Sequence, residues 1–274
     1  MILSFNVNGR TVQIDTANWF DISIPLLFDG EQPNAFGVER AVSTACEAGT
    51  LIGDTRRGGS CNFEQITLIP HCNGTHTECI GHLTRQRIAI LDCLREAFSP
   101  AVLTSVEPEN AAQTTESYAV EVEENDLLIT RKVLEKALSN HQLPITNDTA
   151  LIIRTLPNDK SKLSRTYRDE VPPYFSTKAM EFINEIGVRH LLVDLPSIDR
   201  IYDQGKLANH RIFWELASGS FELNEKSLVH KTITELIYVP TEIVDGWYLL
   251  NLQIAPFAAD AAPGRPLLFR ILNA

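Results

Sequence analysis

Short stretches in which apolar and polar residues alternate open the chain and predict edge or hairpin strands. They occupy residues 1–6, 11–14 and 20–27. Asp29-Gly30 then marks a turn, and a loop-rich region runs to residue 62. Residues 63–70 (FEQITLIP) alternate again and lead into a segment dense in His and Cys. We expect functional side chains where this strand ends, because loops at strand ends commonly carry them.

Strand and helix signals alternate through the middle of the chain. Thr130 is placed to cap a helix through Leu138, and Ser176 to cap a helix over 177–186. Strands are predicted at residues 101–107, 117–123, 150–155 and 188–194. A strand, a helix and a strand in this order predict a parallel crossover and hence an α/β core.

The carboxyl-terminal part returns to strands after one short helix, which indicates a mixed sheet. The helix is predicted at 210–217, and the strands at 232–239, 247–255 and 267–272. No internal repeat and no Pro- or Ser-rich linker divides the sequence. We therefore predict one domain over residues 1–274, whose 44% hydrophobic content is sufficient for a large core.

Composition excludes two classes of partner. The chain has 24 Lys and Arg against 35 Asp and Glu, a net charge of −11 without a basic block, so we expect no nucleic-acid partner. Its apolar runs are much shorter than the roughly 20 residues that span a bilayer, and no targeting segment is visible at residues 1–8, so no membrane partner is expected. Five cysteines, an odd number, favour a reducing compartment, and we predict a cytoplasmic protein.

Three of the seven histidines, His71, His76 and His82, fall close together, with Cys72 and Glu78 among them. Imidazole, thiolate and carboxylate groups on a loop that bends at glycine are ligands that a divalent metal ion takes. The segment lacks the paired spacing of a zinc finger, which favours an open catalytic site over a structural one. Ligation by His and Glu suits Zn²⁺ or Mn²⁺.

The same segment resembles the signature of a known family. Gly74-Thr75-His76-Thr77-Glu78 followed by His82 is similar to the Gly-Thr-His-x-Asp-x-x-x-His pattern of the cyclase-like metal-dependent hydrolases, which include bacterial kynurenine formamidases and isatin hydrolases. Further segments resemble those of the family in the same order along the chain: Asp21-Ile22-Ser23, Gly53-Asp54, Asp194-Leu195-Pro196-Ser197-Ile198-Asp199, His210-Arg211-Ile212-Phe213 and Ile233-Thr234-Glu235-Leu236.

The resemblance implies a swivelling β/β/α domain with a mixed sheet, flanking helices and one or two metal ions per chain. The ligands would come from the loop and from two distant segments: His71, His76, Glu78, His210 and Glu235. His82 would be the acid/base residue beside the metal. The family's first histidine corresponds in position to Cys72, so either Cys72 or His71 could complete the shell; we favour His71, because imidazole keeps the family's ligand chemistry. Residues 218–228 would be an insertion that loops out.

Read from the residues alone, Glu235 could be a metal ligand, a proton acceptor or a solvated strand carboxylate. A bound metal ion would activate water, and a neutral His82 could accept its proton and pass it to a leaving nitrogen.

The family's activity implies hydrolysis of a small amide or formamide. The specific expectation is arylformamidase activity, a step of tryptophan catabolism. Alternatives are a hydrolase of cyclic amides or lactams on the same centre, and a metal- or metabolite-binding protein without turnover. The resemblance also implies a small-molecule substrate and a homo-oligomer, a dimer or larger.

Overall fold

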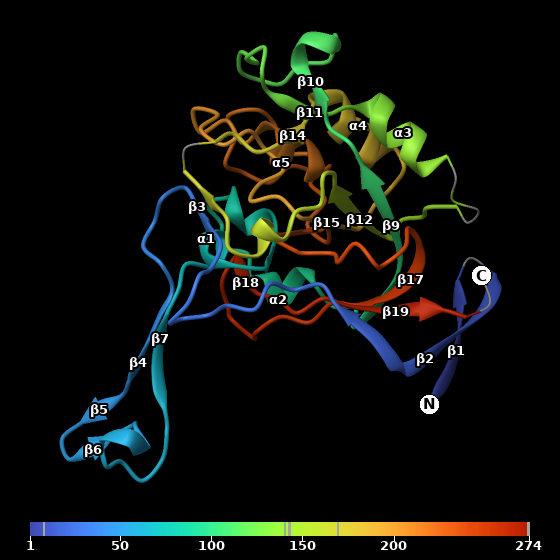
Figure 1. Ribbon diagram of the computed structural model, residues 1–274. Helices are drawn as coiled ribbons and strands as arrows, with labels where there is room; N and C mark the ends of the chain where they lie inside the picture. The colour runs from blue at the N-terminus through green and yellow to red at the C-terminus, as the bar shows by residue number, and fades with distance from the viewer. Residues whose placement is uncertain (8, 140, 142–143, 169, 273–274) are drawn as a thin grey trace.

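The computed structural model describes residues 1–7, 9–139, 141, 144–168 and 170–272. Its centre is a ten-stranded sheet (Figure 1). From one edge to the other the strands are β1 (Ile2–Val7), β2 (Arg10–Asp21), β19 (Leu267–Ile271), β17 (Gly246–Asn251), β9 (Phe98–Val106), β12 (Ala150–Thr155), β15 (His190–Val193), β16 (Thr232–Glu235), β8 (His76–Glu78) and β18 (Ala261–Pro263). β1 and β2 form an antiparallel hairpin at one edge, as the alternation near the amino terminus predicts.

The strands at the centre of this sheet run parallel. β12 pairs in parallel with β9 on one side and with β15 on the other, and β16 continues the run beyond β15. The helix α4 (Thr177–Glu185) lies between β12 and β15 in the chain, which confirms the predicted crossover. β17 and β8 flank the run in antiparallel pairings, so the predicted α/β fold with a mixed sheet is confirmed.

Helices and chain segments cover both faces of the parallel strands. The helices are α1 (Pro70–Asn73), α2 (Ile90–Cys93), α3 (Arg131–Leu138), α4 (Thr177–Glu185) and α5 (Ala208–Phe213). The Thr130 and Ser176 hydroxyls accept hydrogen bonds from the first turns of α3 and α4, so both predicted caps form. In β9, Val102 packs in the core with these helices, while Leu103 packs in a second core on the opposite face. Burial on both faces is typical of parallel strands.

Short strands form smaller sheets around the main one. They are β3 (Asn34–Ala35) with β13 (Thr166–Tyr167), β10 (Glu109–Asn110) with β11 (Leu127–Ile129) and β14 (Tyr174–Phe175), β4 (Val42–Ala45) with β7 (Glu64–Thr67), and β5 (Glu47–Ala48) with β6 (Leu51–Ile52). Single 3₁₀ turns occur at Thr55–Arg57, Ile80–His82, Ala111–Gln113 and Lys160–Leu163. Residues 42–67, which we call the arm, project away from the rest of the chain (Figure 1).

Residues 117–123 do not form the strand that their alternation predicts. The alternate apolar side chains are real, but they pack in a small cluster: Tyr118 is buried against Tyr174, with Val120 and Val122 beside it. The period-two pattern therefore reports burial of one side of an irregular segment, without a pairing partner.

Several other elements are shorter than predicted. β2 ends at Asp21, so residues 22–27 lie outside it. β16 ends at Glu235 because Leu236 adopts a left-handed φ of 53°, and Glu215, with φ of 52°, follows the end of α5 in the same way. Within the described ranges, no helix is long and apolar enough to cross a membrane.

Candidate metal centre

The short strand β8 places two of the predicted ligands on one face of the sheet. His76 and Glu78 are two residues apart, so their side chains point the same way, while Thr77 points to the other face and bonds to Thr234. β8 lies between β16 and β18, and Glu235 is directly opposite His76. Strand pairing thus brings Glu235 beside His76 and Glu78, from which it is distant in sequence. All three are buried, which excludes the alternative in which Glu235 is a solvated strand carboxylate.

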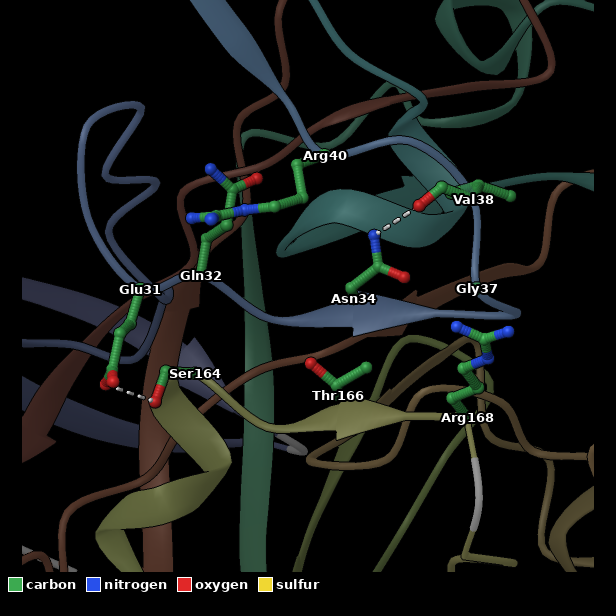
Figure 2. A pocket seen from close by; sticks show the side chains of 9 residues that line it. All are labelled: Glu31, Gln32, Asn34, Gly37, Val38, Arg40, Ser164, Thr166 and Arg168. Atoms are coloured by element: carbon green, nitrogen blue, oxygen red, sulfur yellow. Dashed lines mark hydrogen bonds between the residues drawn. The ribbon is translucent and has the colours of Figure 1, made fainter.

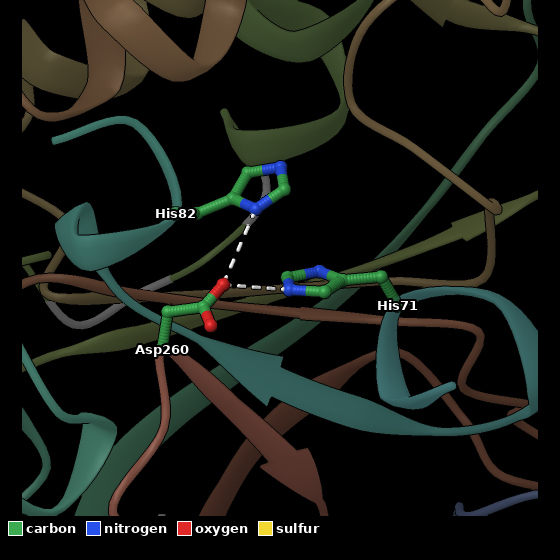
Figure 3. A group of neighbouring side chains, drawn as sticks. All are labelled: His71, His82 and Asp260. Atoms are coloured by element: carbon green, nitrogen blue, oxygen red, sulfur yellow. Dashed lines mark hydrogen bonds and ion pairs between the residues drawn. The ribbon is translucent and has the colours of Figure 1, made fainter. Parts of the chain in front are cut away.

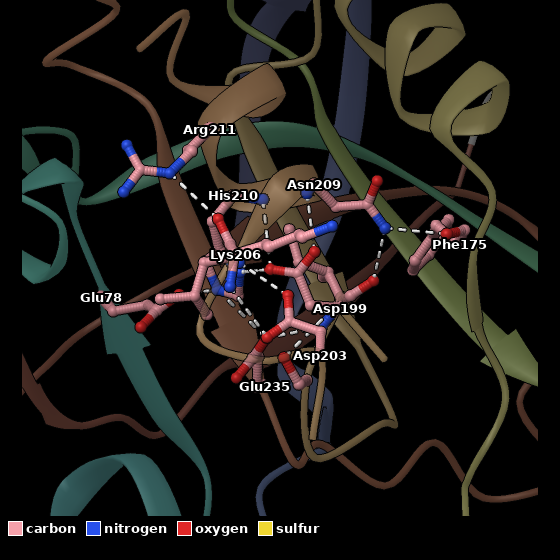
Figure 4. Close-up of polar contacts among 12 residues, drawn as sticks. Glu78, Phe175, Asp199, Asp203, Lys206, Asn209, His210, Arg211 and Glu235 are labelled. Carbon is pink, nitrogen blue, oxygen red and sulfur yellow. Dashed lines mark hydrogen bonds and ion pairs between the residues drawn. The ribbon is translucent and has the colours of Figure 1, made fainter. Parts of the chain in front are cut away.

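Helix α5 supplies His210 to the same face. Its Nε2 atom lies 2.8 Å from Glu78 Oε1 and 3.7 Å from Glu235 Oε1. Its Nδ1 atom donates a hydrogen bond to Asp199 Oδ2 (Figure 4). Asp199 also accepts from the backbone N–H of Asn209, so this carboxylate fixes both the start of the helix and the imidazole. Residues 218–228 follow α5 on the surface and leave His210 beside Glu235.

His71 and His82 approach from the other side and share one carboxylate. His71 Nδ1 lies 2.9 Å from Glu78 Oε2, and its Nε2 lies 2.8 Å from Asp260 Oδ2. The His82 ring stacks on His71 with 4.2 Å between centroids, and its Nδ1 lies 3.4 Å from the same Asp260 oxygen (Figure 3). Asp260 therefore holds both imidazoles in position.

Solvent reaches this arrangement from one side only. The side chains of His76, Glu78, His210 and Glu235 are at most 5% exposed. Those of His71, His82 and Asp260 are 23%, 26% and 39% exposed. A small molecule would therefore reach the centre past His71, His82 and Asp260.

The hydrogen bonds of His76 fix which of its nitrogens can bind a cation. Nδ1 bonds to the carbonyl oxygen of Gly74, which only accepts, so Nδ1 carries the proton and Nε2 carries the lone pair. Burial lowers the pKa of His76 to about 4, which keeps the ring neutral. Nε2 is buried without a hydrogen-bond partner among the described residues and faces Glu235 Oε2 at 3.7 Å. A lone pair facing a carboxylate is stabilised by a cation between them.

The pKa values of the buried groups also indicate a site for a cation. Burial and the neighbouring Glu78 raise the pKa of Glu235 to about 8. Although burial opposes it, Glu78 and Asp199 raise the pKa of His210 well above its usual range. The pKa of His71 likewise rises to about 10 against the effect of burial, through its bonds with Asp260 and Glu78. Protons thus balance an excess of negative charge that a divalent ion would also balance.

The candidate ligand atoms fall into three overlapping groups, each within 4.8 Å: His71, His76 and Glu78; Glu78, His210 and Glu235; and His71, His82 and Asp260. His71 and Glu78 each belong to two of them. The imidazole and carboxylate donors fit Zn²⁺ or Mn²⁺. Cys72 is buried outside all three groups, and burial raises the pKa of its thiol to about 11, which disfavours the thiolate that metal binding needs.

The side chains that the sequence singled out as ligands and as the acid/base residue lie close together in the structure. The sequence analysis did not identify Asp260 and did not assign a role to Asp199. Asp260 is the only charged residue between Gln253 and Arg265, which is a weak signal by itself. Its position depends on β18 pairing with β8, and no local spacing indicates that pairing. Asp199 lies in a segment that resembles the family, and its contact with His210 requires the turn that places α5.

Comparisons with known proteins agree with this fold. The family model described as "Putative cyclase" matches residues 12–200. A kynurenine formamidase of Bacillus mycoides is 25% identical over 260 residues, which cover 92% of this chain and 98% of the relative. Isatin hydrolase A from Labrenzia aggregata bound to benzyl benzoate has a similar structure, with a TM-score of 0.60 and 15% identity over 92% of this chain and 93% of that one.

A predicted metal-dependent hydrolase from Bacillus stearothermophilus is also similar, with a TM-score of 0.57 and 16% identity over 92% of this chain and 98% of that one. At this identity the structures share the fold, which confirms the predicted swivelling β/β/α class. The family model covers more than half of the sequence. The chain therefore belongs to the Cyclase family.

Proposed function

We propose that this chain is a metal-dependent hydrolase of a small amide or formamide, with arylformamidase activity. The observation that carries the proposal is the buried lone pair of His76 Nε2, which faces the carboxylates of Glu78 and Glu235. The hydrolase names of the relatives, a kynurenine formamidase and an isatin hydrolase, support the reaction class. Such an activity would belong to tryptophan catabolism.

The residues that would hold the metal are His71, His76, Glu78, His210 and Glu235. Glu78 belongs to two of the three groups, so the centre has donors for one ion or for two that share this carboxylate. A bound Zn²⁺ or Mn²⁺ supplies a water of lowered pKa and polarises the carbonyl oxygen of the substrate.

His82 is the residue that we assign to proton transfer. Its Nδ1 faces Asp260 Oδ2, an acceptor, so in the neutral ring Nδ1 carries the proton and Nε2 is the basic atom. Asp260 orients this ring through the same oxygen that bonds to His71. In an amide hydrolysis, His82 Nε2 would take a proton from the attacking water and return it to the leaving nitrogen.

Turnover of N-formyl anilides tests the function. Protein purified without chelator and loaded with Zn²⁺ or Mn²⁺ should hydrolyse them, and His76→Ala should lose both the bound metal and the activity. His230→Ala, which changes an exposed histidine outside the centre, is the matched control. Metal-loaded protein that leaves formyl anilides and cyclic amides intact would contradict the proposal, with elemental analysis confirming that the metal is bound.

The arm supports the proposal of a homo-oligomer, a dimer or larger. Its apolar side chains Val42, Leu51, Phe63 and Ile66 are exposed, and an apolar surface of this kind favours a protein partner. Light scattering should give a mass above 30.6 kDa, and Leu51→Ser with Ile66→Ser should lower it. A monomeric wild-type protein at micromolar concentration would refute the idea.

A further inference from the structure

A small polar pocket opens beside the exposed side of the metal centre. Its volume is about 290 Å³, and His82 and Asp260 form one of its walls. Arg85 and Arg87 line it as well, from the loop that follows His82. Because the side chains of His76, Glu78, His210 and Glu235 are buried, this pocket lies where a substrate would approach.

The backbone around the pocket is held in place. Cys79 N–H donates to the carbonyl of Asp260 at 3.0 Å, and Ile90 N–H donates to that of Ala259 at 2.8 Å. These bonds connect both ends of the loop 79–90, which carries Arg85 and Arg87, to the segment that carries Asp260. A Cβ atom at Gly81 would lie 2.1 Å from the carbonyl oxygen of Ile88, so the loop closes on itself at a position that only glycine permits. Such a frame can position a ligand.

The charges that line the pocket leave one cation without a counter-ion. Asp260 is paired with His71 and His82. Arg85 Nη1 lies 3.1 Å from Glu222, and its guanidinium lies over the Phe221 ring. Arg87 is exposed and has no hydrogen bond or ion pair with any described residue. In a chain with a net charge of −11, an unpaired guanidinium in a pocket favours an anionic ligand.

A second polar pocket contains arginines but lacks this relation to the centre. It has a volume of about 380 Å³ and lies over β3 and β13, where Arg40 and Arg168 line it (Figure 2). Arg40 donates to the carbonyl oxygen of Gly30, so part of its guanidinium is already used. None of the candidate metal ligands lines this pocket.

We propose that Arg87 binds the carboxylate of the substrate, which makes the substrate class a small amide or formamide that carries a carboxylate. This inference rests on the proposed function, because it concerns the same site. Guanidinium groups bind carboxylates through two parallel hydrogen bonds, which fixes the orientation of the ligand as well as its charge. The volume lies at the lower end of the range for ligand pockets, which suits a molecule with a single ring.

Two substrates that differ in one group test the proposal. N-formylanthranilate carries a carboxylate, and formanilide is the same molecule without it. We expect the metal-loaded wild type to favour the charged substrate in kcat/KM by about 10- to 100-fold, mainly through KM. Arg87→Gln should reduce this ratio to near one, and Arg87→Lys should retain part of it. Arg95→Gln changes another exposed arginine, outside the pocket, and should leave the ratio as in the wild type.

A binding experiment separates this proposal from the proposed function. Titration of the metal-loaded wild type and Arg87→Gln with benzoate and with benzamide needs no turnover. Benzoate binding that exceeds benzamide binding and depends on Arg87 would support the carboxylate site, even if no amide is hydrolysed. Hydrolysis of both formyl substrates with equal kcat/KM, unchanged in Arg87→Gln, would overturn the carboxylate site while leaving the hydrolase intact. Equal and Arg87-independent binding of benzoate and benzamide would also overturn it.

Discussion

Replacing Asp199 by Asn should weaken metal binding from behind the centre. In the folded protein one oxygen of Asp199 accepts from His210 Nδ1, and the other accepts from Asn209 N–H at 2.6 Å and from the Tyr118 hydroxyl at 2.6 Å. Asparagine keeps one oxygen and replaces the other by an NH₂ group, which cannot accept. If the oxygen faces His210, the Asn209 N–H loses its acceptor, while the Tyr118 hydroxyl can still donate to Asp203; if the oxygen faces Asn209, the imidazole loses its acceptor.

The size of the effect follows from these contacts. A carboxylate behind a ligating imidazole fixes its orientation and makes it a stronger donor, and loss of such a partner typically costs about 10- to 100-fold in metal affinity. Each buried partner left unsatisfied costs about 1–3 kcal/mol of folding stability. We therefore expect Asp199→Asn to bind Zn²⁺ about 10- to 100-fold more weakly and to unfold at lower urea concentration.

Asp203→Asn is the control for this experiment. Asp203 also accepts from Tyr118, at 2.7 Å, and from the backbone of Leu207, but it has no contact with His210. It should therefore lose stability and keep its metal affinity. The assay is competition for Zn²⁺ with a chromogenic chelator, run beside urea unfolding. Wild-type affinity in Asp199→Asn, or an equal loss in both variants, would show that Asp199 does not act through His210.

Three further outcomes follow from the structure. His82→Ala should keep its metal while turnover falls by about 10²- to 10⁴-fold; loss of metal in proportion to activity would make His82 a ligand instead. Cys72→Ser should leave metal content unchanged and His71→Ala should lower it, by elemental analysis, and the reverse pattern would make the thiolate the ligand. His190 is buried, and burial lowers its pKa to about 3, so it stays neutral while the same imidazole in the unfolded chain takes up a proton below its ordinary pKa of 6.5. Between pH 7 and pH 4 the wild type should therefore lose about 3 kcal/mol more of its unfolding free energy than His190→Gln. If urea unfolding at the two pH values gives the same loss of unfolding free energy for both proteins, the reasoning is refuted.

Sequence patterns predict what neighbours in the chain determine. The caps at Thr130 and Ser176 predicted α3 and α4 because a cap is a contact over three residues. The crossover between β12 and β15 was likewise readable from the order of the elements. The cluster of His71, His76, Glu78 and His82 was visible because these residues lie within one segment, although their roles at the centre stay a prediction.

Contacts that depend on strand pairing were beyond these patterns. Asp260 reaches His71 and His82 only because β18 pairs with β8, which is far away in sequence. The alternation at 117–123 describes burial correctly and gives the wrong element, because Tyr118 and its neighbours pack against other loops and short strands. Leu236 ends β16 because its backbone is left-handed, and a leucine in the sequence gives no indication of this conformation.

The alternation of side chains along β8 limits where residues can be inserted into or deleted from this chain. Because His76 and Glu78 face the centre and Thr77 faces away, deletion or insertion of a single residue within 76–78 would turn the threonine inward and a ligand outward. Because β8 is paired on both sides, it cannot shift its register to turn the ligands inward again. The loop at 218–228 is mostly exposed and contains no candidate ligand, so a change in its length does not exchange the inward and outward faces of a strand. Indels in homologues should therefore accumulate in that loop and be absent from the three residues of the strand.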